Sequence, residues 1–282
     1  MEKRTAPTGE QAMPAKVRVG AVNYLNTKPL IEDLTTFAPN ADLRLDLPSR
    51  LADQMRDGQL DVALIPVIEY FRAGDYTHVP GVSIASRGPV LSVTLFSRVP
   101  WEQIQSVALD EGSRTSAALT KVLLHHKHGL RPRTVQLPIE VAADDMTTDA
   151  VLLIGDRAMQ SCLPGFTYAY DLGQEWFDWT GLPFVFAVWA VRPGVDLRGV
   201  DAGLRQARDH GLQRAGHIAW REAPGLQLDA GMCRRYLSNI LSFDLGEAEL
   251  AGLRRFYQLA CELDLAPEGV ELREYAAPLV AA

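Results

Sequence analysis

The chain has 282 residues, of which 47% are hydrophobic and 22% are charged, and its formal net charge is -7. This length allows two lobes with separate cores, and the composition is that of an ordinary globular protein. The negative charge argues against nucleic acid as a partner, because phosphate backbones require a basic face, and it leaves any anionic ligand dependent on a local group of donors.

Three further features narrow the class of protein. No apolar run reaches the ~20 residues that a membrane helix needs, so we expect no membrane contact. Cys162, Cys233 and Cys261 show neither CxxC pairing nor metal-ligand spacing, which predicts reduced thiols and no metal site. Residues 1–16 are polar and interrupted by prolines and glycine, without an apolar leader segment. We expect a disordered arm and a cytoplasmic protein.

A first series of alternating strands and helices follows this arm. The strand expected at 17–22 leads into a polar loop at 23–27 and a helix that Pro29 can begin, because its missing N–H would have no partner there. Strands at 43–47 and 61–66, each followed by a helical pattern, give the element order of a parallel sheet. The carboxyl edge of such a sheet is where α/β proteins bind ligands.

The pattern then indicates a second lobe. Strand-like runs end at residues 86 and 97, separated by the turn Arg87-Gly88-Pro89, and we expect the chain to cross over at the end of the second run. A second α/β series follows, and the apolar β run at 184–191 is interpreted as the return crossing before a helical tail. Tyr236 and Phe256, at helical spacing in this tail, are expected in the core. We predict residues 17–96 and 188–282 in the first lobe and residues 97–187 in the second.

The best candidate for an anion site is the run Ser-Arg-Thr-Ser at 113–116, before a helix at 117–126. Three hydroxyls, a guanidinium and the N–H groups of a helix's first turn favour a carboxylate or a phosphate. A capped helix with a solvated arginine is the alternative, although one cap needs only one hydroxyl. Lys28 and Arg87 are either second anion contacts or simply exposed. Asp156 either faces the cleft as an acid or base or caps the helix that follows it.

Several common enzyme classes are excluded by the absence of their motifs. The sequence contains no P-loop, no Gly-x-Gly-x-x-Gly and no Gly-x-Ser-x-Gly pattern, which argues against nucleoside triphosphates, dinucleotides and serine-hydrolase chemistry. Each predicted lobe contains a strand, a polar loop and a helix start. Two such halves joined by two crossings form a cleft whose walls are helix N-termini.

The run Val-Gly-Ala-Val-Asn-Tyr-Leu-Asn-Thr-Lys-Pro-Leu at 19–30 resembles the opening motif of the chorismate dehydratases of the futalosine route to menaquinone. Further agreement lies at 88–93, 113–116 and 151–156, and above all in Trp-Thr-Gly-Leu-Pro-Phe-Val-Phe-Ala-Val-Trp at 179–189. These motifs extend over residues 17–190. The resemblance implies an α/β, two-lobed, type 2 periplasmic-binding-protein-like fold with a ligand cleft between the lobes.

The same resemblance implies that chorismate loses water to give 3-[(1-carboxyvinyl)oxy]benzoate, the first step of that route, without a cofactor. Chorismate carries two carboxylates, which suits a cleft with donors on both walls. We expect one carboxylate at 113–116 and the other near Asn26, Thr27 and Ser92. The full set of candidates is Asn26 and Asp156 for catalysis, and Tyr24, Leu25, Thr27, Pro66, Arg87, Ser92, Ser113, Arg114, Thr115, Ser116, Gly155, Thr180 and Gly181 for substrate binding.

The identity of the base is open at this point. The matching motifs offer no strong base except Lys28, and the amide of Asn26 cannot take a proton. One hypothesis is that the lobes close and the substrate's own enolpyruvyl carboxylate removes the C3 proton; the alternative is Asp156. Two other functions also remain open, because fold does not determine function: a non-catalytic binding protein for a small carboxylate, and the sister enzyme acting on a later intermediate.

Overall fold

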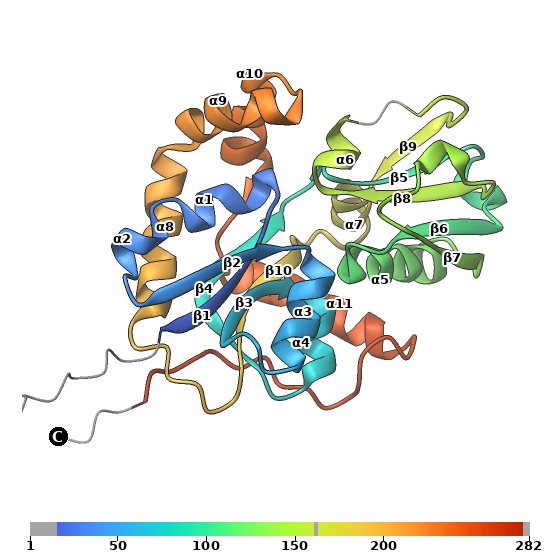
Figure 1. Ribbon diagram of the computed structural model, residues 1–282. Coiled ribbons are helices and arrows are strands. Elements are labelled where there is room, and N and C mark those ends of the chain that lie inside the picture. Colours follow the sequence, from blue (N-terminus) through green and yellow to red (C-terminus); the bar gives the residue numbers. More distant parts are fainter. Residues whose placement is uncertain (1–15, 161–162, 279–282) are drawn as a thin grey trace, which may run out of the picture.

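The computed structural model describes residues 16–160 and 163–278. Most of the predicted N-terminal arm (residues 1–15) and Cys162 lie outside these ranges. Figure 1 shows two α/β lobes side by side, the first at the left and the second at the right. The two-lobed α/β prediction is therefore confirmed.

The first lobe is built on a six-stranded sheet with the order β11-β4-β10-β3-β1-β2. β1 is parallel to β2 and β3, as the sequence pattern predicts, whereas β10 is antiparallel to its neighbours β3 and β4. Every residue of β3 is buried, as expected of a strand in a sheet covered on both faces. The strands are β1 (Val17–Val22), β2 (Ala41–Asp46), β3 (Val62–Pro66), β4 (Thr77–Ser86), β10 (Phe184–Val191) and β11 (Leu241–Ser242).

Helices cover both faces of this sheet (Figure 1). Those from the first α/β series are α1 (Lys28–Ile31), α2 (Leu34–Phe37), α3 (Pro48–Arg56) and α4 (Val67–Ala73), and those from the tail are α8 (Val200–Gln213), α9 (Ala215–Leu226), α10 (Ala230–Arg235) and α11 (Glu247–Cys261). Two short irregular turns belong to the same lobe. A 3-10 turn at Leu25–Thr27 follows β1, and a π-helical turn at Tyr236–Ile240 continues α10.

The second lobe contains a five-stranded sheet with the order β7-β6-β8-β5-β9. Its strands are β5 (Val93–Ser97), β6 (Ser106–Asp110), β7 (Arg133–Leu137), β8 (Ala150–Ile154) and β9 (Tyr168–Asp171), and its helices are α5 (Arg114–Val122), α6 (Gly155–Gln160) and α7 (Leu172–Thr180). The helix predicted at 117–126 begins three residues earlier, because Ser113 caps it, and ends in a π-helical turn at Leu123–Lys127.

Both crossings between the lobes lie earlier in the chain than predicted. β5 belongs to the second sheet, so the first crossing is the segment 87–92. All of β10 belongs to the first sheet, so the return crossing is the segment 181–183. The turn at Gly88, which has a φ of 109°, already ends the first lobe's strand. The sequence pattern instead predicted the crossing at the end of the run beyond this turn, near residue 97.

A single half-buried carboxylate connects the first crossing to α7. Asp171 accepts hydrogen bonds from the N–H groups of Val90 and Leu91 at 2.7–3.0 Å. It also caps α7, by accepting from the N–H groups of Gly173 and Gln174 at 3.0 and 3.1 Å. Burial raises the pKa of Asp171, against the effect of these four N–H groups. Asp171 therefore fixes the first crossing to the start of α7.

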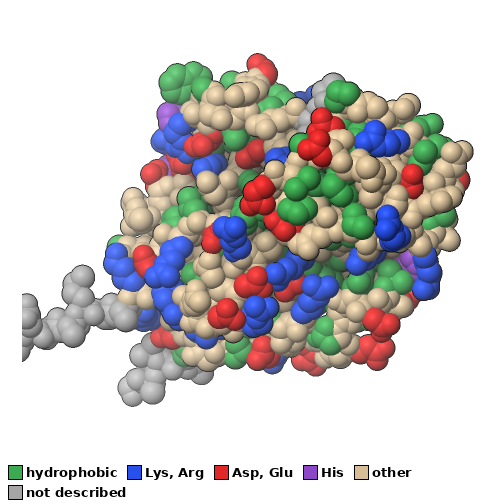
Figure 2. Space-filling model, turned by 45° about the vertical axis from the view of Figure 1, so that its right-hand side comes forward, with side chains coloured by type: hydrophobic (Ala, Val, Ile, Leu, Met, Phe, Trp, Pro, Cys, Tyr) green, Lys and Arg blue, Asp and Glu red, His purple; other side chains and the backbone are tan. Residues whose placement is uncertain are grey.

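The main core extends through the first lobe and continues beneath the second sheet. Its largest fully buried side chains include Trp176, Trp189, Tyr236 and Phe256, so the core prediction for the last two is confirmed. No helix in residues 16–160 and 163–278 is both long and apolar enough to span a bilayer. On the face shown in Figure 2, basic and acidic side chains are interspersed and do not gather into one basic patch.

Candidate active site between the two lobes

The lobes meet around a cavity of about 60 Å³. Its lining residues come from both lobes: Val22, Tyr24, Asn26, Pro48, Pro66, Ile84, Val90, Ser92, Val93, Ser113, Ser116, Ile154, Gly155, Phe186 and Ala187. Within the described chain, this lining contains hydroxyls and one amide but no lysine, arginine or histidine. A ligand here would be held by neutral hydrogen-bond donors and apolar contacts.

The loop after β1 supplies the first wall. Thr27 is fully buried, and its hydroxyl donates to Asn26 Oδ1 at 3.2 Å. This bond fixes the orientation of the Asn26 amide, so that its NH₂ group is the part left to act as a donor. Asn26 and Tyr24 line the cavity, as does Pro66 at the end of β3. These three residues lie where the sequence predicted them.

The start of α5 supplies the second wall. Ser113 Oγ accepts from the backbone N–H of Ser116 at 3.3 Å and lies 2.9 Å from Ser116 Oγ. Both serines line the cavity. Thr115 does not: its hydroxyl accepts from the N–H of Ile68 at 3.3 Å and so caps α4 of the other lobe. All three hydroxyls therefore have a role in the fold, and Thr115, predicted as a ligand contact, does not line the cavity.

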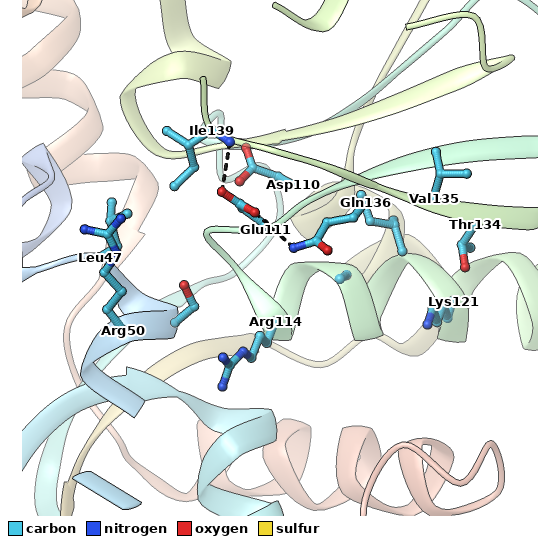
Figure 3. A pocket seen from close by; sticks show the side chains of 13 residues that line it. Leu47, Arg50, Asp110, Glu111, Arg114, Lys121, Thr134, Val135, Gln136 and Ile139 are labelled. Carbon is cyan, nitrogen blue, oxygen red and sulfur yellow. Dashed lines mark hydrogen bonds between the residues drawn. The ribbon is translucent and has the colours of Figure 1, made fainter. Parts of the chain in front are cut away.

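Arg114 also lies outside the cavity, contrary to the prediction. Its guanidinium crosses to the first lobe and pairs with Asp53 at 2.8 Å and with Glu69 at 3.2 Å. Figure 3 shows the side chain pointing away from Asp110 and Glu111, along the edge of an outer groove of about 490 Å³. The sequence could not reveal this arrangement, because the two acidic partners are 61 and 45 residues away in the chain.

Three further candidates lie away from the cavity. The Arg87 guanidinium is paired with the buried carboxylate of Glu249 at 2.7 Å. The Thr180 hydroxyl donates to the carbonyl of Trp176 at 2.8 Å, and Gly181 ends α7 with a φ of 70°. Thr180 and Gly181 therefore terminate a helix and do not contact the cavity. The motif that contains them reaches the cavity further on, through Phe186 and Ala187.

Two contacts join the walls beside the cavity. The backbone N–H of Leu25 donates to Asp156 Oδ1 at 3.3 Å, across the two lobes. The ring of Tyr24 lies against Gly155, so closely that a Cβ on this glycine would be 3.1 Å from the ring. Gly155 has a φ of 60°, and its N–H donates to the carbonyl of Ser92 at 2.8 Å. Leu25, Gly155 and Asp156 therefore hold the lobes together.

The model of a protein family described as menaquinone biosynthesis matches residues 17–262. The chain belongs to this family. Two curated relatives carry the name chorismate dehydratase. The protein from Thermus thermophilus is 33% identical over 241 residues, covering 78% of this chain and 87% of the relative. The protein from Campylobacter jejuni is 26% identical over 254 residues, covering 88% of this chain and 99% of the relative. The family resemblance inferred from the sequence motifs is confirmed.

Solved structures show that this menaquinone-biosynthesis protein has a periplasmic-binding-protein-like fold. A protein from Archaeoglobus fulgidus has a TM-score of 0.71 at 16% identity, over 89% of this chain and 98% of its own. The periplasmic aliphatic sulphonate binding protein of Escherichia coli has a TM-score of 0.66 at 17% identity, over 96% and 95%. At these identities the likeness establishes the fold alone.

Two titratable groups of this family member lie at the contact between the lobes. Burial, together with the nearby Asp110 and Asp156, raises the pKa of Tyr24 to about 12, so its phenol stays protonated at neutral pH. Burial also raises the pKa of Asp156, although the Leu25 N–H and Lys28 act in the opposite direction. Tyr24 is thus a hydrogen-bond donor, and charged Asp156 is disfavoured in the folded chain.

Asp156→Asn should raise the melting temperature at pH 7 by a few degrees. The folded pKa of Asp156 lies above its unfolded value, so its contribution to stability is complete below about pH 4 and is lost as the pH rises through the folded pKa. A neutral isostere avoids this loss. The gain should therefore vanish in melting curves recorded below about pH 4.

Asp149→Asn is the matched control, for which we expect the melting temperature at pH 7 to change in the opposite direction. Burial acts to raise the pKa of Asp149, but hydrogen bonds from Gln105 and Ser106 outweigh it and hold the pKa below its usual value. This variant should melt earlier than the wild type at pH 7 and approach it in acid. A melting temperature of Asp156→Asn that fell at pH 7 would contradict the assignment.

Proposed function

We propose that this chain is a chorismate dehydratase, a hydro-lyase that converts chorismate to 3-[(1-carboxyvinyl)oxy]benzoate and water. The observation that carries the proposal is the match to the menaquinone-biosynthesis family and to two relatives of that name, in a chain whose interlobe cavity is lined by hydroxyl and amide donors. The reaction would be the first step of the futalosine route, in the cytoplasm, where a biosynthetic enzyme meets this metabolite.

Substrate binding requires the lobes to separate first. The cavity of about 60 Å³ is far smaller than the ~300–1,000 Å³ of typical ligand sites. Entry would break the contacts of Arg114 with Asp53 and Glu69, and closure around the substrate would restore them. In the closed state, Asn26 and Ser92 on one wall and Ser113 and Ser116 on the other would donate to the two carboxylates.

The lining favours the substrate as its own base. None of its side chains within the described residues is a strong base, and Tyr24 is protonated at neutral pH. The enolpyruvyl carboxylate takes the proton from C3, the C3–H electron pair becomes the third double bond of the ring, and the C4–O bond breaks. The carboxyl group gives this proton to the departing hydroxide, which leaves as water, and the carboxylate is restored. Closure contributes mainly by holding the carboxylate near C3 with bulk water excluded.

The proposed activity is tested by mixing the purified chain with chorismate. We expect chorismate to disappear and an aromatic product lighter by one water molecule to accumulate in equal amount, followed by absorbance and mass spectrometry. Binding of chorismate without its consumption would identify a binding protein and contradict the proposal.

Asp156→Asn should retain nearly full turnover. Asparagine keeps the oxygen that accepts from the Leu25 N–H, so the interlobe contact survives while the carboxylate is lost. The measurement is the kcat for chorismate from pH 6 to 9. A variant that binds chorismate normally but no longer turns it over would make Asp156 the base.

Arg114→Gln should raise the KM for chorismate about three- to tenfold, with a smaller change in kcat. Its two ion pairs join the closed lobes, so their loss makes the closed complex less stable relative to the open one, from which the substrate dissociates. Asp53 and Glu69 keep Arg56 and Arg72 as partners, so the fold is not left with unpaired acids. Arg44→Gln, which removes an exposed ion pair within one lobe, is the control. An unchanged KM in Arg114→Gln would contradict the role given to these two ion pairs.

A further inference from the structure

A tyrosine outside the cavity lining connects two of the cavity's polar side chains. Tyr236 is 1% exposed and begins the π-helical turn after α10. Its hydroxyl donates to Ser92 Oγ at 2.7 Å, and the Asn26 side chain lies near enough to lower the pKa of Tyr236. Sequence analysis placed this residue in the core, which is correct for the ring, but no local pattern reveals the partners of its hydroxyl.

We propose that Tyr236 is a positioning residue: its hydroxyl orients Ser92 so that the serine donates its own proton to a substrate oxygen. This proposal rests on the proposed function and deepens it. A serine hydroxyl carries one proton and can accept through its lone pairs. Because Tyr236 occupies an acceptor position of Ser92, the serine proton is directed elsewhere. Ser92 lines the cavity, and in the described residues no side chain or carbonyl accepts that proton.

Two hydrogen bonds set which atoms of Asn26 and Ser92 remain free to donate. Thr27 donates to Asn26 Oδ1, which leaves the Asn26 NH₂ group to donate. Tyr236 lies between Asn26 and Ser92 and donates to Ser92. Burial raises the pKa of Tyr236, while Ser92 and Asn26 oppose this rise, so the phenol keeps its proton. The bond from Tyr236 polarises the Ser92 hydroxyl, which lines the cavity.

The geometry goes beyond what packing requires. A buried phenol needs one partner to offset its desolvation. Tyr236 instead donates to a polar side chain that lines the cavity, Ser92 in the crossing between the lobes, and lies near a second, Asn26 in the loop after β1. Tyr236 therefore connects the first lobe to the crossing. This connection lies where a substrate oxygen, from a carboxylate or the leaving hydroxyl, would be.

The test is a double-mutant cycle with Tyr236→Phe and Ser92→Ala, measured as kcat/KM for chorismate. Tyr236→Phe should lower kcat/KM about tenfold in the wild-type background and by less than twofold in the Ser92→Ala background, because its effect passes through Ser92. Tyr70→Phe is the matched control, since it removes another fully buried phenol, whose hydroxyl contacts His78 and the carbonyl of Arg273. It should change kcat/KM by less than twofold and the melting temperature about as much as Tyr236→Phe.

The outcomes separate the two proposals. A wild-type chain that does not consume chorismate overturns the proposed function and the positioning role together. An active wild type with an unaffected Tyr236→Phe variant overturns the positioning role alone. A tenfold loss that persists in the Ser92→Ala background also overturns it, because it would show that Tyr236 acts through something other than Ser92.

Discussion

Asn26→Ala will lower kcat for chorismate roughly a hundredfold or more, with a small change in melting temperature. The Asn26 amide is half-buried at the cavity, and Thr27 fixes its orientation, so it is a donor already aligned before the substrate arrives. Removal of one such pre-oriented donor from an active site lowers turnover by ~10²–10³-fold, because it acts where charge develops. The measurement is steady-state kinetics on purified protein.

Asn23→Ala is the control for this variant. Asn23 lies in the same loop, is exposed, and accepts a hydrogen bond only from Lys28 Nζ at 3.2 Å among the interactions of the described chain. Its replacement should leave kcat within twofold of the wild type. Equal losses in the two variants would mean that the loop as a whole, and not the Asn26 amide, is responsible.

Gly155→Ala will reduce kcat/KM about tenfold to a hundredfold by hindering closure. The added Cβ would lie 3.1 Å from the Tyr24 ring, which belongs to the opposite lobe, so the clash arises when the lobes meet. The φ of 60° adds backbone strain of ~1–2 kcal/mol to the folded state whether or not the lobes are closed. Kinetics and thermal melting together separate these two effects.

Gly194→Ala carries the same backbone strain without the clash. Its φ is 73°, and a Cβ there would meet nothing within 4 Å. We expect a similar loss of melting temperature but unchanged kcat/KM. If Gly194→Ala lost activity as Gly155→Ala does, the loss would reflect destabilisation and not impaired closure.

Much of the fold could be predicted because it follows from local periodicity. The buried strands β1 and β3 and the amphipathic helix α5 are visible in the sequence as apolar runs with recognisable spacing. The sequence pattern predicted both crossings too far along the chain, since an apolar strand has the same pattern in either sheet. Which sheet β5 joins depends on its pairing with β8, a strand more than fifty residues away.

The candidate site was predicted in part, for a related reason. Ser113 and Ser116 follow from a helix start, which is a local signal. Arg87 and Arg114 were misplaced because a long charged side chain pairs with whatever acid the fold brings near it. Here those acids are Glu249 and Asp53, on other helices. The hydroxyl of Tyr236 was missed because its partners, 144 residues away in the case of Ser92, leave no trace in the surrounding sequence.

The most direct test of the account is a crystal structure of the chain with the benzoate product bound. Besides the cavity lined by neutral donors, the structure has larger outer grooves edged by cations, among them the groove with Arg50, Arg114 and Lys121. We predict the ring between Asn26 and Ser92 on one side and Ser113 on the other, with Arg114 still paired to Asp53. A product seated in the outer groove against those three cations would contradict the account.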